Sequence, residues 1–156
     1  MTTLHHAGVC VRDMDASLRF YRDALGLTVL TDKVLNADLE SLLAVRTESV
    51  RTVFLGDVEH TDSGIVELVD LRVPRIADDR PQPGVPSRGV FLLSLQVDVR
   101  AVLSRLEEMG LGGTPRTMPT PGGGLAATVI DPDGVMVELL PMGTLAVMKD
   151  PAVMKD

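Results

Sequence analysis

The sequence is poor in the residues that build several familiar kinds of site. It has a single cysteine, Cys10, in 156 residues, which excludes an internal disulfide framework and a cysteine-rich zinc site. It has no tryptophan, one tyrosine and three phenylalanines, so stacking of a large planar ligand on aromatic rings is disfavoured. No apolar run approaches the roughly 18 residues that a membrane-spanning helix needs.

Positive charge is also scarce. The chain has 15 Lys and Arg against 22 Asp and Glu, a formal net charge of −7, and no basic cluster. We therefore expect neither nucleic acid nor a membrane surface as its partner. The first residues, 1–6, lack the basic and apolar pattern of a secretion leader, so we expect a cytoplasmic protein. About 45% of the residues are hydrophobic, enough for a globular core.

The first half of the chain alternates between patterns typical of strands and helices. We expect a strand at 4–11, a helix at about 15–25, strands at 27–31, 50–55 and 64–71, and a short helix at 36–45. Asp13 or Asp15 can cap the first helix and Gly26 can end it. Phe20 and Tyr21 are expected in the core, and His60 in a solvated turn between two strands.

The pattern then restarts after a proline-rich segment at 72–88, which reads as a linker because proline interrupts helices and sheets. The second half predicts a strand at 89–97, a helix from Asp98 to Gly110, and strands near 113–118, 125–130 and 135–140. The tail at 142–156 contains AVMKD twice. We expect one domain, 1–156, made of two modules at 4–71 and 89–141.

Each half thus reads as a β-α-β-β-β module, and the fold class is α+β. One such module leaves an apolar sheet face uncovered, so two modules must pair. Pairing within the chain and pairing with a second copy both remain open, and we expect a homodimer.

Four segments carry a resemblance to a known family. These are LHHAGVCVRD with FYRDALGL at 4–27, IVELV at 65–69, the restart GVFLLSLQVD with its helix at 89–111, and DPDGVMVELL at 131–140. Together they resemble the vicinal oxygen chelate superfamily, which includes glyoxalase I, bleomycin-resistance proteins and extradiol dioxygenases. The resemblance implies paired βαβββ modules, each with a curved sheet enclosing a cleft.

The resemblance also implies a set of metal ligands, two from each module. On the family pattern, His6 takes the first position, Glu67 the second and Glu138 the fourth. The third position falls on Leu92, which has no lone pair to offer, so the ligand set is incomplete. We expect a weakly bound divalent metal such as Zn, Ni, Mn, Co or Fe, or none. The dioxygenase branch is disfavoured because its iron site needs two histidines and one carboxylate.

The residues also allow plainer interpretations. Strand alternation puts His5 and His6 on opposite faces of a sheet, so only one of them can face a cleft. Glu67 and Glu138 lie within apolar strands, where a buried carboxylate needs a partner, a metal or a raised pKa. Each glutamate could instead lie on an edge strand and face solvent.

Three functions remain open. The first is an isomerase or lyase that acts on a small carbonyl-containing substrate, with Glu138 and Glu67 as the catalytic carboxylates and a metal that polarises the carbonyl. The second is a metal-free protein that binds a small molecule such as an antibiotic, which Leu92 favours. The third is a metal-free enzyme in which His6 and the glutamates act directly as acid and base. We lean towards an enzyme.

Overall fold

The computed structural model describes residues 1–74, 76, 83–145 and 148. By their internal contacts the residues form two compact units, Met1–Arg80 and Pro81–Asp156. The division falls inside the segment at 72–88 that the sequence predicts as a linker. In the described part of the chain, none of the helices is long and apolar enough to cross a membrane.

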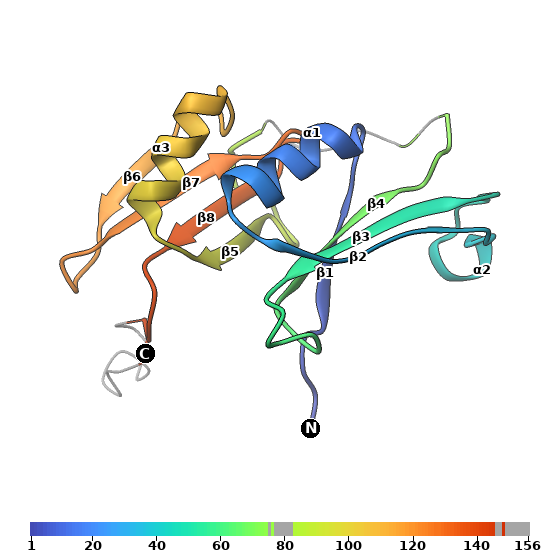
Figure 1. Cartoon of the computed structure of the whole chain (residues 1–156), viewed down its shortest axis with the longest axis horizontal. Helices are drawn as coiled ribbons and strands as arrows, with labels where there is room; N and C mark the ends of the chain where they lie inside the picture. Colours follow the sequence, from blue (N-terminus) through green and yellow to red (C-terminus); the bar gives the residue numbers. More distant parts are fainter. Residues whose placement is uncertain (75, 77–82, 146–147, 149–156) are drawn as a thin grey trace. The chain divides into compact units, whose positions relative to one another are not determined.

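The first unit is a β-α-β-β-β module with a four-stranded sheet in the order β1-β4-β3-β2 (Figure 1). Its strands are β1 (His6–Cys10), β2 (Thr28–Leu35), β3 (Val50–Gly56) and β4 (Ile65–Asp70). β1 and β4 pair in parallel, while β4 with β3 and β3 with β2 pair antiparallel. This is the predicted module, with β2 longer than the expected 27–31.

The predicted helix at 15–25 forms as α1 (Met14–Leu18), which continues directly into a π-helical turn, η1 (Arg19–Ala24). The Asp13 carboxylate caps α1 by accepting hydrogen bonds from the backbone N–H groups of Asp15 and Ala16. Gly26, at a φ of 85°, lies just beyond the last helical residues, where a left-handed conformation is easiest for glycine. The helix at 36–45 is shorter than predicted, because only α2 (Glu40–Leu43) is helical and none of its residues is buried.

The core of this unit lies on one face of its sheet. Val9, Val53 and Leu68, from three adjacent strands, are almost fully buried, and α1 packs against β4. Phe20 and Tyr21 are completely buried and meet edge to face, which confirms their expected place in the core. Because side chains alternate along a strand, the residues between these core positions point to the other face, which the helix does not cover.

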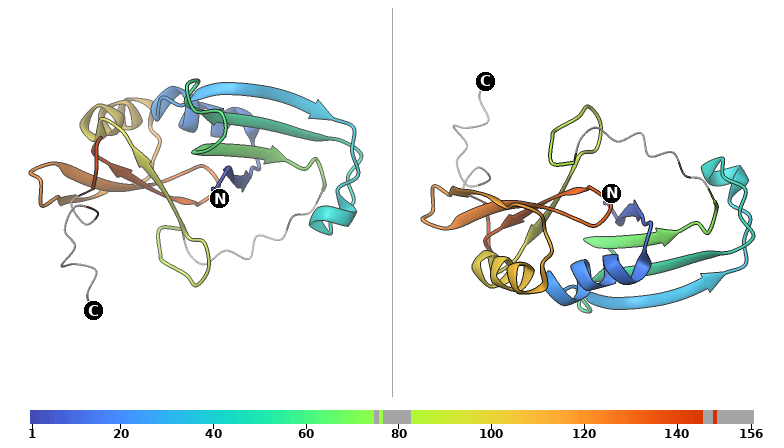
Figure 2. Two further views of the ribbon diagram at one scale, coloured as in Figure 1. Left: turned by 90° about the horizontal axis from the view of Figure 1, so that it is seen from below. Right: turned by 90° about the horizontal axis from the view of Figure 1, so that it is seen from above.

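The second unit repeats the module with β5 (Leu92–Gln96), α3 (Val99–Met109), β6 (Arg116–Pro119), β7 (Leu125–Ile130) and β8 (Met136–Leu140). Its sheet has the equivalent order, β5-β8-β7-β6, with β5 and β8 parallel. Asp98 caps α3 through the N–H of Ala101, and Gly110 ends it in a left-handed conformation, both as predicted. In both views of Figure 2, α3 lies along one face of this sheet.

The turn between β7 and β8 follows the predicted Asp131-Pro132-Asp133-Gly134 chemistry. The Asp131 carboxylate accepts hydrogen bonds from the N–H groups of Asp133 and Val135, and Gly134 takes a φ of 87°. The repeated AVMKD tail lies almost entirely outside the described residues. The two βαβββ modules confirm the predicted α+β fold class.

Candidate functional site

In the first unit, the sheet face opposite the helix carries a row of hydrogen-bonded polar side chains. His6 Nε2 lies 3.2 Å from Glu67 Oε2. The other carboxylate oxygen, Oε1, accepts a hydrogen bond from the Thr52 hydroxyl at 2.6 Å. Glu67 is therefore held at both oxygens, one by a group from β1 and the other by a group from β3.

The pairing of the strands explains why these residues meet. Glu67 stands opposite Gly8 on β1 and opposite Phe54 on β3. His6 and Gly8 are two residues apart and so share a face. The ring of His6 packs edge to face on Phe54, with 5.6 Å between the ring centroids. Gly8 leaves this area open, because a Cβ added there would meet nothing within 4 Å.

The side chain of Glu67 is largely shielded from solvent. Its side chain is 18% exposed, whereas that of His6 is 40% exposed. Glu67 lies on β4, which runs between β1 and β3, and Glu138 lies on β8, between β5 and β7. The alternative that these glutamates sit on edge strands is therefore wrong for both. The polar neighbours that a half-buried carboxylate needs are supplied by hydroxyl and imidazole groups.

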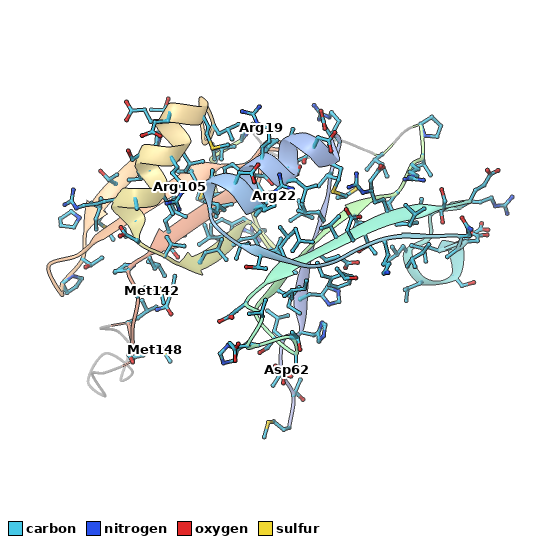
Figure 3. The ribbon with its side chains drawn as sticks, viewed as in Figure 1. Arg19, Arg22, Asp62, Arg105, Met142 and Met148 are labelled. Atoms are coloured by element: carbon cyan, nitrogen blue, oxygen red, sulfur yellow. The ribbon has the colours of Figure 1, made fainter. Side chains whose placement is uncertain are left out.

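The prediction that His5 and His6 point to opposite faces is wrong. His5 lies just before β1, where strand alternation does not yet apply, and its Nδ1 is 2.8 Å from the Nδ1 of His6. The two rings are nearly perpendicular, at 88°. His60, by contrast, lies where expected, on the turn between β3 and β4 that also carries Asp62 (Figure 3), and its side chain is 71% exposed.

In the second unit, the equivalent face carries Glu138. Ser94 stands opposite Glu138 in the pairing of β5 with β8, and its hydroxyl donates a hydrogen bond to Glu138 Oε2 at 2.6 Å. Leu92 lies two residues before Ser94, just as His6 lies two residues before Gly8. The strand register therefore makes Leu92 the counterpart of His6, and its place as the missing ligand stays a prediction.

The structure brings together His6 and Glu67 within one unit, and Leu92 and Glu138 on one face of the other. Within either unit alone, the described residues contain no group of three His, Cys, Asp or Glu side chains that could hold a metal ion. A site with three protein ligands would need side chains from both units, and the convergence of His6, Glu67 and Glu138 stays a prediction.

Sequence reasoning missed the two hydroxyl groups that hold the glutamates. Ser94 is a polar residue inside the apolar stretch Leu92–Gln96, and Thr52 shares the alternation of Phe54 along β3. A polar residue inside an otherwise apolar strand is a signal that the sequence offers. What the sequence does not reveal is which strand lies next to it, because β1 pairs with β4 across more than 50 intervening residues.

Comparisons with known proteins agree with this architecture. Residues 3–139 match the family model described as Glyoxalase/Bleomycin resistance protein/Dioxygenase superfamily. A lactoylglutathione lyase-like protein, terB, of Aspergillus terreus is 35% identical over 147 residues, which cover 88% of this chain and 74% of that protein.

Two solved structures show the same fold. Glyoxalase I of Leishmania major superposes with a TM-score of 0.62 at 23% identity, covering 90% of this chain and 87% of that one. TnmS3, an antibiotic binding protein from a Streptomyces species, gives a TM-score of 0.56 at 23% identity, covering 92% and 98%. At these identities the structures establish the fold alone. With the family model spanning both modules, the chain belongs to the glyoxalase/bleomycin resistance protein/dioxygenase superfamily.

Proposed function

We propose that this protein is a lyase or isomerase that moves a proton on the carbon next to the carbonyl group of a small substrate. The observation that carries the proposal is the linked set of His6, Glu67 and Thr52 on the open face of the first sheet. A carboxylate held at both oxygens is oriented before substrate arrives, and such orientation favours catalysis. The similarity to a lactoylglutathione lyase-like protein supports the same reaction class.

The two glutamates would have different roles in this reaction. Glu67 is engaged by His6 and Thr52, so it is suited to hold and orient. In the described part of the chain, Ser94 is the residue that bonds to Glu138, and it engages only Oε2. Oε1 of Glu138 is then available to take a proton from the substrate carbon, and the same oxygen can return that proton to complete an isomerisation.

The residues of the first unit fit a divalent metal as a pair. Two ligands about 2.1 Å from one ion, at tetrahedral or octahedral angles, lie roughly 3.0–3.4 Å apart, and His6 Nε2 and Glu67 Oε2 lie 3.2 Å apart. These two atoms would hold the ion, with Glu138 as the expected third ligand. When bound, the metal would polarise the substrate carbonyl. With Leu92 in place of a fourth ligand, we expect weak binding.

The proposal is tested with lactoylglutathione in deuterated buffer, by following the loss of its α-hydrogen signal in proton NMR. We expect the protein to speed this exchange and Glu138→Gln to slow it by about 10²–10⁴-fold, the usual contribution of a general base. Glu67→Gln should also slow the exchange, because it removes the carboxylate that holds and orients. His60→Ala, which removes a histidine from an exposed turn, is the matched control and should match the wild type. Exchange no faster than in buffer would refute the reaction with this substrate.

A second function has a specific observation in its favour. Leu92 gives the open face of the second unit an apolar side chain where the family pattern expects a metal ligand, and an apolar wall suits the binding of a small molecule without chemistry. The fold of TnmS3 is compatible with this alternative. Tight binding of a small apolar ligand, unaffected by Glu138→Gln and without turnover, would favour it over the enzyme.

A further inference from the structure

The contact between the rings of His5 and His6 is not used by the function proposed so far. Their Nδ1 atoms are 2.8 Å apart, which is hydrogen-bond distance. A bond between two ring nitrogens needs one proton, with one ring as donor and the other as acceptor. The tautomers of the two rings are therefore coupled.

A contact on the other side of His6 favours one of the two arrangements. Its Nε2 faces Glu67 Oε2 at 3.2 Å, and an ionised carboxylate only accepts hydrogen bonds. A neutral His6 that carries its proton on Nε2 can donate to this oxygen, and its Nδ1 then has a lone pair. Only a His5 that is protonated on Nδ1 can donate to that lone pair.

His5 is anchored well enough to do this, although it precedes β1. Its backbone carbonyl accepts a hydrogen bond from the N–H of Ile65, at the start of β4. Its ring stands edge to face with that of His6, at 5.1 Å between the centroids. The ring of His6 is itself packed on Phe54, so the orientation of both rings is constrained.

We propose that His5 is a positioning residue that, together with Glu67, fixes the tautomer of His6. Without metal, His5 donates from Nδ1 and keeps the proton of His6 on Nε2, against Glu67. With a metal on Nε2, His6 would carry its proton on Nδ1, and His5 would be the Nε2–H tautomer that accepts its hydrogen bond. Outer partners of this kind orient a metal-binding histidine and fix its tautomer. The metal-bound state rests on the proposed function, whereas the metal-free tautomers rest on geometry alone.

The test is ¹⁵N NMR of the three histidine rings in metal-free protein, at an alkaline pH at which the ¹⁵N shifts themselves show neutral rings. Single variants of His5, His6 and His60 assign the signals. We expect His5 to be protonated on Nδ1, which is the less common tautomer of free histidine in water, and His6 on Nε2. His5→Phe should shift the His6 nitrogens toward a mixture of tautomers, whereas His60→Phe should leave them unchanged.

A second variant distinguishes the effect of losing the hydrogen bond from the effect of changing the packing of the ring. His5→Asn keeps an N–H donor close to the position of Nδ1, so it should retain the Nε2–H tautomer of His6 that His5→Phe loses. Two results would overturn the proposal. One is that His5 carries its proton on Nε2 in metal-free protein, and the other is that the His6 signals are unchanged in His5→Phe.

Titration with Zn²⁺ tests the metal-bound state. We expect His5→Phe to weaken binding by about 10-fold, at the low end of the effect of an outer partner, and His5→Asn to weaken it less. If wild-type protein binds no Zn²⁺ but shows the expected tautomers, the metal part of the proposed function fails and the positioning role of His5 stands.

Discussion

The two modules share one backbone plan and differ at the side chains of their open faces. Glu67 and Glu138 occupy equivalent positions in the two sheets, because each pairs with a residue of the first strand of its module, β1 or β5. Next to them the first module has His6 and Gly8, and the second has Leu92 and Ser94. In the first module the glutamate meets an imidazole and a hydroxyl from β3, and in the second it meets a hydroxyl from β5.

This difference shows which parts of a repeated module are free to change. The helix-covered faces of both units need apolar side chains at alternate positions, because they form the cores. The open faces carry no such requirement, so one copy can keep a potential ligand while the other replaces it with leucine. The first three predictions that follow test this contrast between core and open face and between the two open faces, and the fourth tests an ion pair found only in the first module.

The largest effect is expected in the cores, where the two modules should behave alike. Leu68 and Leu139 directly follow Glu67 and Glu138 on β4 and β8, and both are completely buried. Leu68→Ala and Leu139→Ala should each lower the free energy of unfolding by about 2–5 kcal/mol, because each removes buried methyl groups and leaves a cavity. Urea unfolding measures this. A loss below about 1 kcal/mol in either variant would show that its core is not packed as described.

A single substitution should make the second open face resemble the first. Leu92→His places an imidazole beside Glu138 as His6 lies beside Glu67, so it should strengthen Zn²⁺ binding by about tenfold, or 1.4 kcal/mol. Calorimetric titration of both proteins measures it, with Leu92→Phe as the control that keeps the ring but offers no donor. Equal affinity in all three would mean that the second module takes no part in a metal site.

The two hydroxyl groups should contribute unequally to stability. Thr52 is buried, at 5% exposure, and donates to a half-buried carboxylate, whereas Ser94 is exposed. Thr52→Val should cost about 1.5 kcal/mol, the low end for a hydrogen bond to a charged group, and Ser94→Ala about 0.5 kcal/mol. Chemical unfolding of the two variants side by side gives the comparison. A larger loss of stability for Ser94→Ala than for Thr52→Val would mean that Glu138, and not Glu67, is the carboxylate better shielded from solvent.

The last prediction concerns the long hairpin of β2 and β3 in the first module. Arg51 donates two hydrogen bonds to Asp32, from Nε to Oδ1 at 3.1 Å and from Nη2 to Oδ2 at 2.8 Å, and these bonds, more than the charge itself, hold the pKa of Asp32 below its usual 3.8. A carboxyl group whose pKa is lower in the folded than in the unfolded state stabilises the fold at pH values above its unfolded pKa. This contribution is lost as the pH falls through the folded pKa.

Both side chains are partly exposed, so the expected contribution is below about 1 kcal/mol. Arg51→Met should therefore reduce stability slightly at pH 7, and this loss should shrink as the pH is lowered below 3.8, as measured by urea unfolding at a series of pH values. A loss that stays the same at every pH would indicate lost packing of the arginine stem rather than a lost ion pair.

Much of the fold could be predicted from the sequence because it depends on local patterns. Alternating apolar residues indicated the strands, Asp13 and Asp98 marked where helices begin, and Gly26 and Gly110 marked where they end. The lengths of β2 and α2 were predicted less well. β2 is extended by pairing with β3 as far as Leu35, opposite Val50, and α2 has no buried face to stabilise a longer helix.

The sequence by itself determined that His6, Glu67 and Glu138 are candidate site residues and that Leu92 breaks the pattern, since its motifs resemble the family pattern that implies these positions. Only the tertiary structure decided what each carboxylate touches. Thr52 reaches Glu67 and Ser94 reaches Glu138 because strands distant in sequence pair in one particular register, and a shift of one residue would turn every such side chain to the other face. The contact of His5 with His6 likewise depends on where β1 begins, a boundary that periodicity cannot locate to the residue.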